Sequence, residues 1–167
     1  MQISIKWINE LVNVKEEKLD DLIEKLILGG FEVEETLELR MGGQSQFILD
    51  IAANANRSDS LSIQGISLEI SALLSKSISI STYSIKSESL KQIILQNTRV
   101  LPVEQYCNLL SSVIIENLID LTVPKWVTQK LISSGIIPLG NLLDFQRYIL
   151  LETGYPFTFY DLSLIHI

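Results

Sequence analysis

The apolar side chains at the start of the chain follow two periods, and each change of period marks an expected element. Residues 3–7 alternate as a strand does, and residues 8–12 continue as a short helix, with Trp7 expected to anchor the core. From Glu16 the apolar positions recur at helical spacing while charged residues fill the opposite face, and Gly29-Gly30 is expected to end this helix. The pattern therefore predicts a strand and two helices before residue 31.

Two further strands and a third helix are expected next. Residues 31–39 favour a strand that ends at a Gly42-Gly43 turn, and Phe47–Ile51 is typical of a short buried strand. Apolar residues then recur at helical spacing from Ile63 to Leu74, which predicts a helix.

The polar, turn-forming stretch 50–59 lies between that strand and that helix and is the clearest candidate for a functional segment. We expect Asp59 or Ser60 to cap the helix, because short oxygen-bearing side chains accept from the first free backbone N–H groups. An alternative interpretation is that Asn56 and Asp59 only hydrogen-bond the turn backbone while Arg57 is a solvated charge.

The second half of the chain begins with a Ser-rich stretch, Ser75–Ser89, in which residues 78–81 alternate as in an edge strand before a linker. Proline is favoured in the first turn of a helix, and glycine ends one. The elements expected after the linker are a strand at Val113 and Ile115, a helix from Pro124 to Gly135, a helix from Asn141 to Gly154, and a strand at Phe157–Phe159.

The polar stretch and the helix after it resemble the Asp-Ile-x-Pro-Asn-Arg-Pro-Asp-x-x-Ser-x-x-Gly-x-x-Arg-Glu signature of phenylalanyl-tRNA synthetase β subunits. Both family prolines are absent, and the positions that match are Asp50, Asn56, Arg57, Asp59, Ser62, Gly65 and Glu69. The opening segment Ile3–Val12 and the turn Gly30–Glu34 resemble the start of the same subunit. A third match runs from Pro124 to Asp161 and includes Asn141-Leu142-Leu143-Asp144.

These matches, in the family's order, imply an α+β fold in two parts. The first is a small N-terminal α/β domain at 1–86, and the second is an incomplete α+β domain at 87–167 that resembles the synthetase editing domain. Most bacterial relatives carry an oligonucleotide-binding-fold insertion in the first part, but here only Met41–Gln46 bridges that place. Such short subunits resemble plastid-encoded forms. The expected location is therefore the plastid stroma, with a bacterial-type cytoplasm as the alternative.

The resemblance places the chemistry of phenylalanine attachment outside this chain. In the family the α subunit uses ATP and Mg²⁺, while β supports an α2β2 assembly that binds tRNA(Phe). The α subunit and tRNA(Phe) are thus the implied partners, and this fragment is expected to bind no cofactor itself. Family editing uses an Asn and a His, whose positions hold Arg147 and Thr158 here, so these are degenerate editing positions. The expected structural and interface motif consists of Asn56, Arg57, Asp59, Gly65 and Glu69.

Composition narrows the functional classes further. A formal net charge of −7 argues against independent binding of nucleic acid, because affinity for phosphates comes mainly from Lys and Arg. No apolar run approaches the roughly 20 residues of a membrane span, so no membrane partner is expected. The single Cys107 excludes an internal disulfide and is expected to be a buried apolar residue at a strand entry; with His166 it offers too few ligands for a structural zinc site.

No catalytic residue is expected in the chain. Ester hydrolysis calls for a positioned general base, and the sequence offers no His before the tail. Glu152 and Asp161 flank the turn at Gly154, where surface charge and helix-end hydrogen bonding explain them. The leading hypothesis is an N-terminal, architectural piece of the synthetase β subunit. The alternatives are a free-standing aminoacyl-tRNA deacylase-like domain and a non-catalytic interaction module.

Overall fold

The computed structural model describes residues 1–52, 55–80, 98–101, 110–115 and 122–161. The chain forms two compact units, of which one consists of Met1–Ile80 with Thr122–Ile167 and the other of Ser81–Leu121. The predicted boundary at 86/87 lies close to the first junction between the units. The sequence pattern did not indicate that the chain returns to the first unit at Thr122.

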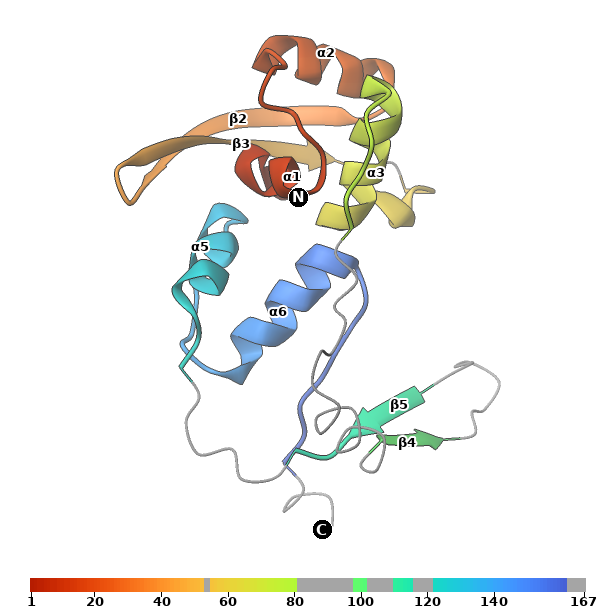
Figure 1. The fold of residues 1–167 in the computed structure, drawn as a ribbon, viewed down its shortest axis with the longest axis vertical. Helices are drawn as coiled ribbons and strands as arrows, with labels where there is room; N and C mark the ends of the chain where they lie inside the picture. Colours follow the sequence, from red (N-terminus) through yellow and green to blue (C-terminus); the bar gives the residue numbers. More distant parts are fainter. Residues whose placement is uncertain (53–54, 81–97, 102–109, 116–121, 162–167) are drawn as a thin grey trace. The chain divides into compact units, whose positions relative to one another are not determined.

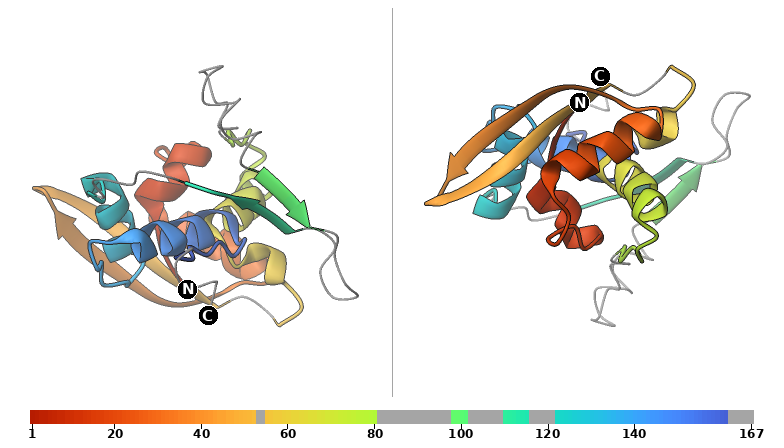
Figure 2. Two further views of the ribbon diagram at one scale, coloured as in Figure 1. Left: turned by 90° about the horizontal axis from the view of Figure 1, so that it is seen from below. Right: turned by 90° about the horizontal axis from the view of Figure 1, so that it is seen from above.

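The first unit contains a three-stranded antiparallel sheet of β1 (Gln2–Ser4), β2 (Glu32–Met41) and β3 (Gln44–Ala52), in the order β1-β3-β2. The hairpin of β2 and β3 closes at Gly42-Gly43, where both residues have positive φ, at 57° and 79°. Two such residues suit a two-residue turn whose twist matches that of the strands. The turn end of the hairpin extends beyond the helices (Figures 1 and 2).

Helices of the first unit lie where the apolar pattern predicted them (Figure 1). They are α1 (Ile5–Leu11), α2 (Leu19–Leu28), α3 (Ile63–Leu74), α5 (Lys125–Ser133) and α6 (Leu142–Thr153), with a 3₁₀ turn, η1 (Ser58–Ser60), before α3. Helix α1 begins earlier than expected, because the Ser4 hydroxyl accepts from the Trp7 backbone N–H and caps it.

One hydrophobic core joins the early and late segments of this unit. Trp7 is only 2% exposed, as expected for a core anchor. Its ring stacks on Tyr148 of α6 with 5.6 Å between centroids, and α3 and α5 contribute Ile66 and Val127 to the same core. The late helices therefore complete the core of the early segment, which explains why residues from 122 onward belong to the first unit.

The described part of the second unit is a two-stranded antiparallel ladder. Its strands are β4 (Thr98–Leu101) and β5 (Leu110–Val113), paired so that Thr98 lies opposite Val113. This confirms the predicted strand at Val113, whereas Ile115, which was predicted to belong to it, lies beyond its end. The expected linker and Cys107 lie outside the described residues, as does His166.

Antiparallel strands together with packed helices confirm the predicted α+β class. The strand predicted at Phe157–Phe159 is wrong, because no described strand pairs with that segment; its two rings pack edge to face instead, 4.7 Å apart. The edge strand at 78–81 is reduced to a single bridge between Ile78 and Val12, and Ser81 lies outside the described residues. Among the described helices, none has the length and apolar character needed to cross a bilayer.

Candidate functional site

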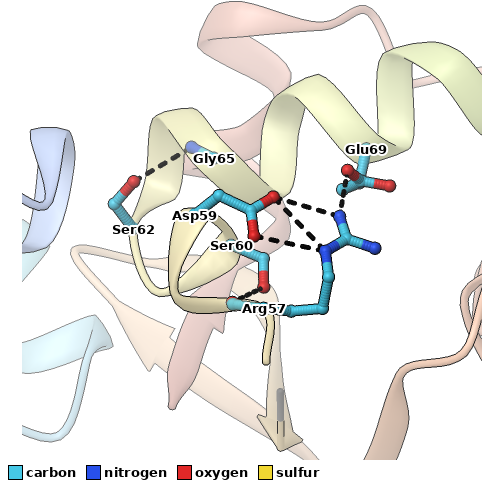
Figure 3. Close-up of polar contacts among 6 residues, drawn as sticks. All are labelled: Arg57, Asp59, Ser60, Ser62, Gly65 and Glu69. Atoms are coloured by element: carbon cyan, nitrogen blue, oxygen red, sulfur yellow. Dashed lines mark hydrogen bonds and ion pairs between the residues drawn. The ribbon is translucent and has the colours of Figure 1, made fainter. Parts of the chain in front are cut away.

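Arg57 lies at the start of the η1 turn that precedes α3, between two carboxylates, as Figure 3 shows. Its Nε lies 3.2 Å from Asp59 Oδ1 and its Nη2 lies 3.1 Å from Asp59 Oδ2, so the guanidinium fork contacts both oxygens. The same Nη2 also donates to Glu69, one and a half turns into α3. A planar fork can hold two such partners at once, whereas a lysine ammonium acts as a point charge. We call Arg57, Asp59 and Glu69 the Arg57 centre.

The charges of the Arg57 centre stabilise one another. The hydrogen bonds from Arg57 hold the pKa of the Asp59 carboxyl below its ordinary value. The hydrogen bond to Asp59, followed by the charge of Glu69, raises the pKa of the Arg57 guanidinium. Arg57 also lies over the Phe31 ring, 5.7 Å from its centroid. Aspartate and arginine are therefore both charged over the whole physiological range.

Ser62, and not Asp59 or Ser60, caps helix α3. The Ser62 hydroxyl accepts from the Gly65 backbone N–H at 3.0 Å. Asp59 and Ser60 lie one turn earlier, in η1, where the Ser60 hydroxyl donates to the Arg57 carbonyl at 2.7 Å. The predicted cap is wrong because the chain makes a 3₁₀ turn before the α-helix starts, which moves the first free N–H groups along the chain.

Gly65 is required by close backbone packing. A Cβ at this position would lie 1.9 Å from the Asp59 carbonyl oxygen, far inside van der Waals contact. The η1 turn thus folds directly onto the first turn of α3, with Arg57 holding it on one side. Asn56, the remaining member of the predicted motif, is exposed beside this turn.

A second cluster around a positively charged side chain, which the sequence analysis did not find, lies where α1, α5 and α6 meet. Lys130 of α5 forms an ion pair with Glu10 of α1 at 2.6 Å. Its Nζ also lies 4.7 Å from the centroid of the Trp7 ring and 5.6 Å from those of Trp126 and Tyr148. Aromatic faces attract cations, and more strongly where water is excluded. We call these five residues the Lys130 centre.

A buried aspartate in the first turn of helix α6 binds the loop that precedes the helix. The fully buried Asp144 carboxylate accepts backbone N–H groups of Leu139 at 2.9 Å and of Gly140 at 2.7 Å. Asn141 caps the helix by accepting from the Leu143 N–H at 3.0 Å. These contacts give a structural reason for the Asn-Leu-Leu-Asp sequence, whose two polar ends hold the loop and the helix start together.

The two degenerate editing positions do not form a common site in the described part of the chain. Arg147 Nη1 donates to the Ile137 carbonyl at 3.2 Å and lies 4.0 Å from Asp144 Oδ1. Thr158 is exposed beyond the end of α6, and no hydrogen bond joins it to Arg147. Arg147 is thus engaged in holding the loop before α6.

Glu152 differs from expectation because it is only 8% exposed, so the surface charge proposed for it is wrong. Helical spacing places it one turn after Tyr148, on the side of α6 that packs into the core. Among the described residues, no group of three or more His, Cys, Asp or Glu side chains is placed to hold a metal ion.

The chain is similar to known proteins over nearly its whole length. It is 55% identical over 166 residues to the chloroplastic phenylalanine–tRNA ligase beta subunit of Phaeodactylum tricornutum, and 34% identical over 169 residues to that of Porphyra purpurea. Each match covers 99% of this chain. The phenylalanine–tRNA ligase beta subunit of Trichormus variabilis is 35% identical over 121 residues, or 71% of this chain and 14% of that protein. Residues 106–166 match the B3/4 domain family.

The Phaeodactylum and Porphyra matches each cover nearly all of this chain but only a small part of the relative. The chain spans 24% of the Phaeodactylum protein and 23% of the Porphyra protein, so it spans about a quarter of the length of these relatives. The Arg57 centre and the Lys130 centre both lie inside the part of this chain that these two alignments cover.

Proposed function

We propose that this chain, whose sequence belongs to the β-subunit family of phenylalanine–tRNA ligase, serves that enzyme as a structural unit and makes or breaks no bond itself. The observation that carries the proposal is the Arg57 centre, in which the residues of the family signature hold a turn against a helix. These side chains are satisfied by one another, so they are occupied in positioning the backbone. The partner would then contact the surface that this turn presents.

The partners of the whole enzyme follow from the same proposal. Attachment of phenylalanine to tRNA(Phe) would take place on an α subunit that uses ATP and Mg²⁺, within an α2β2 assembly. The formal net charge of −7 supports this division, because a chain with few spare cations is poorly suited to hold tRNA alone. The chloroplastic names of two relatives that match 99% of this chain support a plastid location, and we propose the stroma.

The proposal is tested by co-expressing the β polypeptide that contains this chain with its α subunit. We expect the two to co-purify and to attach phenylalanine to tRNA(Phe). Arg57→Ala should weaken their association and leave the rate of the chemical step in the residual complex unchanged, because in this proposal Arg57 only positions a turn of the β chain. Arg40→Ala, which removes an exposed arginine from the hairpin, is the matched control.

Two results would refute this function. One is the absence of any association between wild-type subunits that are each folded. The other is a slower chemical step with unchanged association in the Arg57→Ala enzyme, which would give Arg57 a role in the reaction.

We further propose that the chain does not hydrolyse mischarged tRNA. Arg147 replaces a neutral amide by a fixed cation that already donates to the Ile137 carbonyl, and Thr158 is exposed beyond the end of α6, with no hydrogen bond to Arg147. The purified chain should release no tyrosine from tyrosyl-tRNA(Phe). Saturable release above the rate without protein would instead support a deacylase.

A further inference from the structure

A cleft of about 430 Å³ opens in the first unit between α1, α5 and the turn end of the β2–β3 hairpin. This volume falls within the roughly 300–1,000 Å³ of small-molecule sites. Trp126 lines the cleft and is 49% exposed, although its ring packs nearly perpendicular to that of Tyr148 and Lys130 Nζ lies 5.6 Å from its centroid. A large aromatic ring that stays half exposed on the wall of a cleft offers a face on which another ring can stack.

The charged side chains of the cleft leave an excess of positive charge. They are Lys6, Glu10 and Lys130. Glu10 pairs with Lys130 at 2.6 Å, whereas Lys6 donates to the neutral Gln44 amide oxygen at 3.1 Å. Among the described residues, no carboxylate forms an ion pair with Lys6. In a chain of formal net charge −7, this cleft is locally suited to an anion.

Two amide groups add hydrogen-bond donors to the same wall. The Gln44 oxygen accepts from Lys6, and the Gln46 oxygen accepts from the Ser4 hydroxyl at 2.9 Å. Because both amide oxygens are engaged within the protein, the NH₂ groups of Gln44 and Gln46 remain as donors. Such donors match the carbonyl oxygens and ring nitrogens of a heterocycle.

We propose that this cleft binds a small anion that carries a planar heterocyclic ring, the chemistry of a nucleoside monophosphate. The ring stacks on Trp126, the two glutamine amides donate to its polar edge, and Lys6 pairs with the phosphate. The ligand occupies a place that the Arg57 centre does not touch, so this site is independent of the structural function proposed above.

Uridine 5′-monophosphate is a suitable probe, with uridine and inorganic phosphate as the arms that separate ring from charge. Titration into the purified 167-residue chain is followed through the indole N–H signals of its two tryptophans by nuclear magnetic resonance. We expect a saturable shift of the Trp126 signal with the monophosphate. Uridine should bind up to about fivefold more weakly, since that is the most an exposed ion pair contributes. Inorganic phosphate should also bind more weakly, because it lacks the ring that stacks on Trp126.

Variants locate the binding groups. Lys6→Gln should raise the dissociation constant about fivefold, and Trp126→Leu about tenfold through lost stacking. Lys6 is exposed, so its replacement leaves the fold intact even if Trp126→Leu unfolds the chain. Lys15→Gln, at an exposed lysine that does not line the cleft, should change nothing.

Three results would overturn the site. The first is a Trp126 signal that does not move or does not saturate. The second is binding of uridine or phosphate as tight as that of the monophosphate, and the third is equal weakening by Lys6→Gln and Lys15→Gln, which would mean that the chain attracts anions without a defined site.

Discussion

The Arg57 centre and the Lys130 centre use similar groups in opposite ways. Each places a cation beside a carboxylate and an aromatic ring. Arg57 finds its carboxylates 2 and 12 residues along the chain, whereas the carboxylate of Lys130 is 120 residues away. The first centre fixes a local turn, and the second ties the late helices to the first helix.

This difference in sequence separation decides how the loss of each centre affects the stability of the fold. A local centre shapes its own segment, since the turn and helix remain neighbours in sequence without it. A long-range centre contributes to the packing that brings distant segments together, and the cost of ordering those segments must be met by burial of apolar surface. We therefore expect the largest losses of stability around Lys130 and more localised effects around Arg57.

Trp7→Ala should give the largest effect, about 3–5 kcal/mol of unfolding free energy, because it empties a fully packed aromatic site. Trp126→Ala should cost much less, since that ring is half exposed. Urea unfolding followed by circular dichroism measures both. Equal losses for the two tryptophans would contradict the view that the buried ring of the Lys130 centre joins the early and late segments.

Gly65→Ala tests the tightest contact near the Arg57 centre. A Cβ would meet the Asp59 carbonyl oxygen at 1.9 Å, so the η1 turn must move, at a cost of about 2–3 kcal/mol. Gln64→Ala, one residue earlier and half-buried in the same helical turn, should stay within about 0.5 kcal/mol of wild type. A tolerated Gly65→Ala would show that the turn is not held against α3 as described.

Lys130→Met should be the next largest change, costing about 1–2 kcal/mol, because it keeps the aliphatic stem but removes the cation from the rings. Glu10→Gln should cost less than about 1 kcal/mol, since Glu10 is half exposed. A double-mutant cycle over urea unfolding separates the pair. If Glu10→Gln costs as much as Lys130→Met, the ion pair and not the aromatic contact dominates the centre.

Asp59→Asn should produce the smallest effect and one that depends on pH. The folded-state pKa of Asp59 is lowered by Arg57, so its stabilisation is present above the ordinary aspartate pKa and is lost as pH falls through the lowered one. The difference in Tm between wild type and Asp59→Asn should therefore be present at neutral pH and disappear in strong acid. Asp20→Asn, at an exposed carboxylate of α2, serves as the control; a difference for Asp59→Asn that persists unchanged in acid would contradict the charge assignment.

Elements with a strong local signal were predictable. The alternation and helical spacing located the hairpin and the helices, and Gly42-Gly43 marked the hairpin turn correctly. The cap of α3 was misplaced by two or three residues, since Asp59, Ser60 and Ser62 all have side chains suited to capping and only the 3₁₀ turn selects among them. Phe157–Phe159 looked like a strand but has no described strand to pair with.

The residues of the candidate site were likewise predictable only where they lie close together in the sequence. Arg57, Asp59, Gly65 and Glu69 could be picked out because they follow one another within about three turns of chain and match a known signature. Nothing near Lys130 in sequence pointed to Glu10, and Trp7 and Tyr148 each looked like an ordinary core residue. Glu152 could not be placed as buried from its acidic character alone.

The sequence by itself determined most helices and the β2–β3 hairpin, and it singled out Arg57, Asp59 and Glu69 through a short signature, because periodicity and local motifs act between residues a few positions apart. Only the tertiary structure decided that residues from Thr122 onward return to the first unit, that Lys130 lies among three aromatic rings, and that a cleft opens beside Trp126. Those features depend on which apolar faces pack together across more than a hundred residues, and many pairings of such faces satisfy the same local pattern.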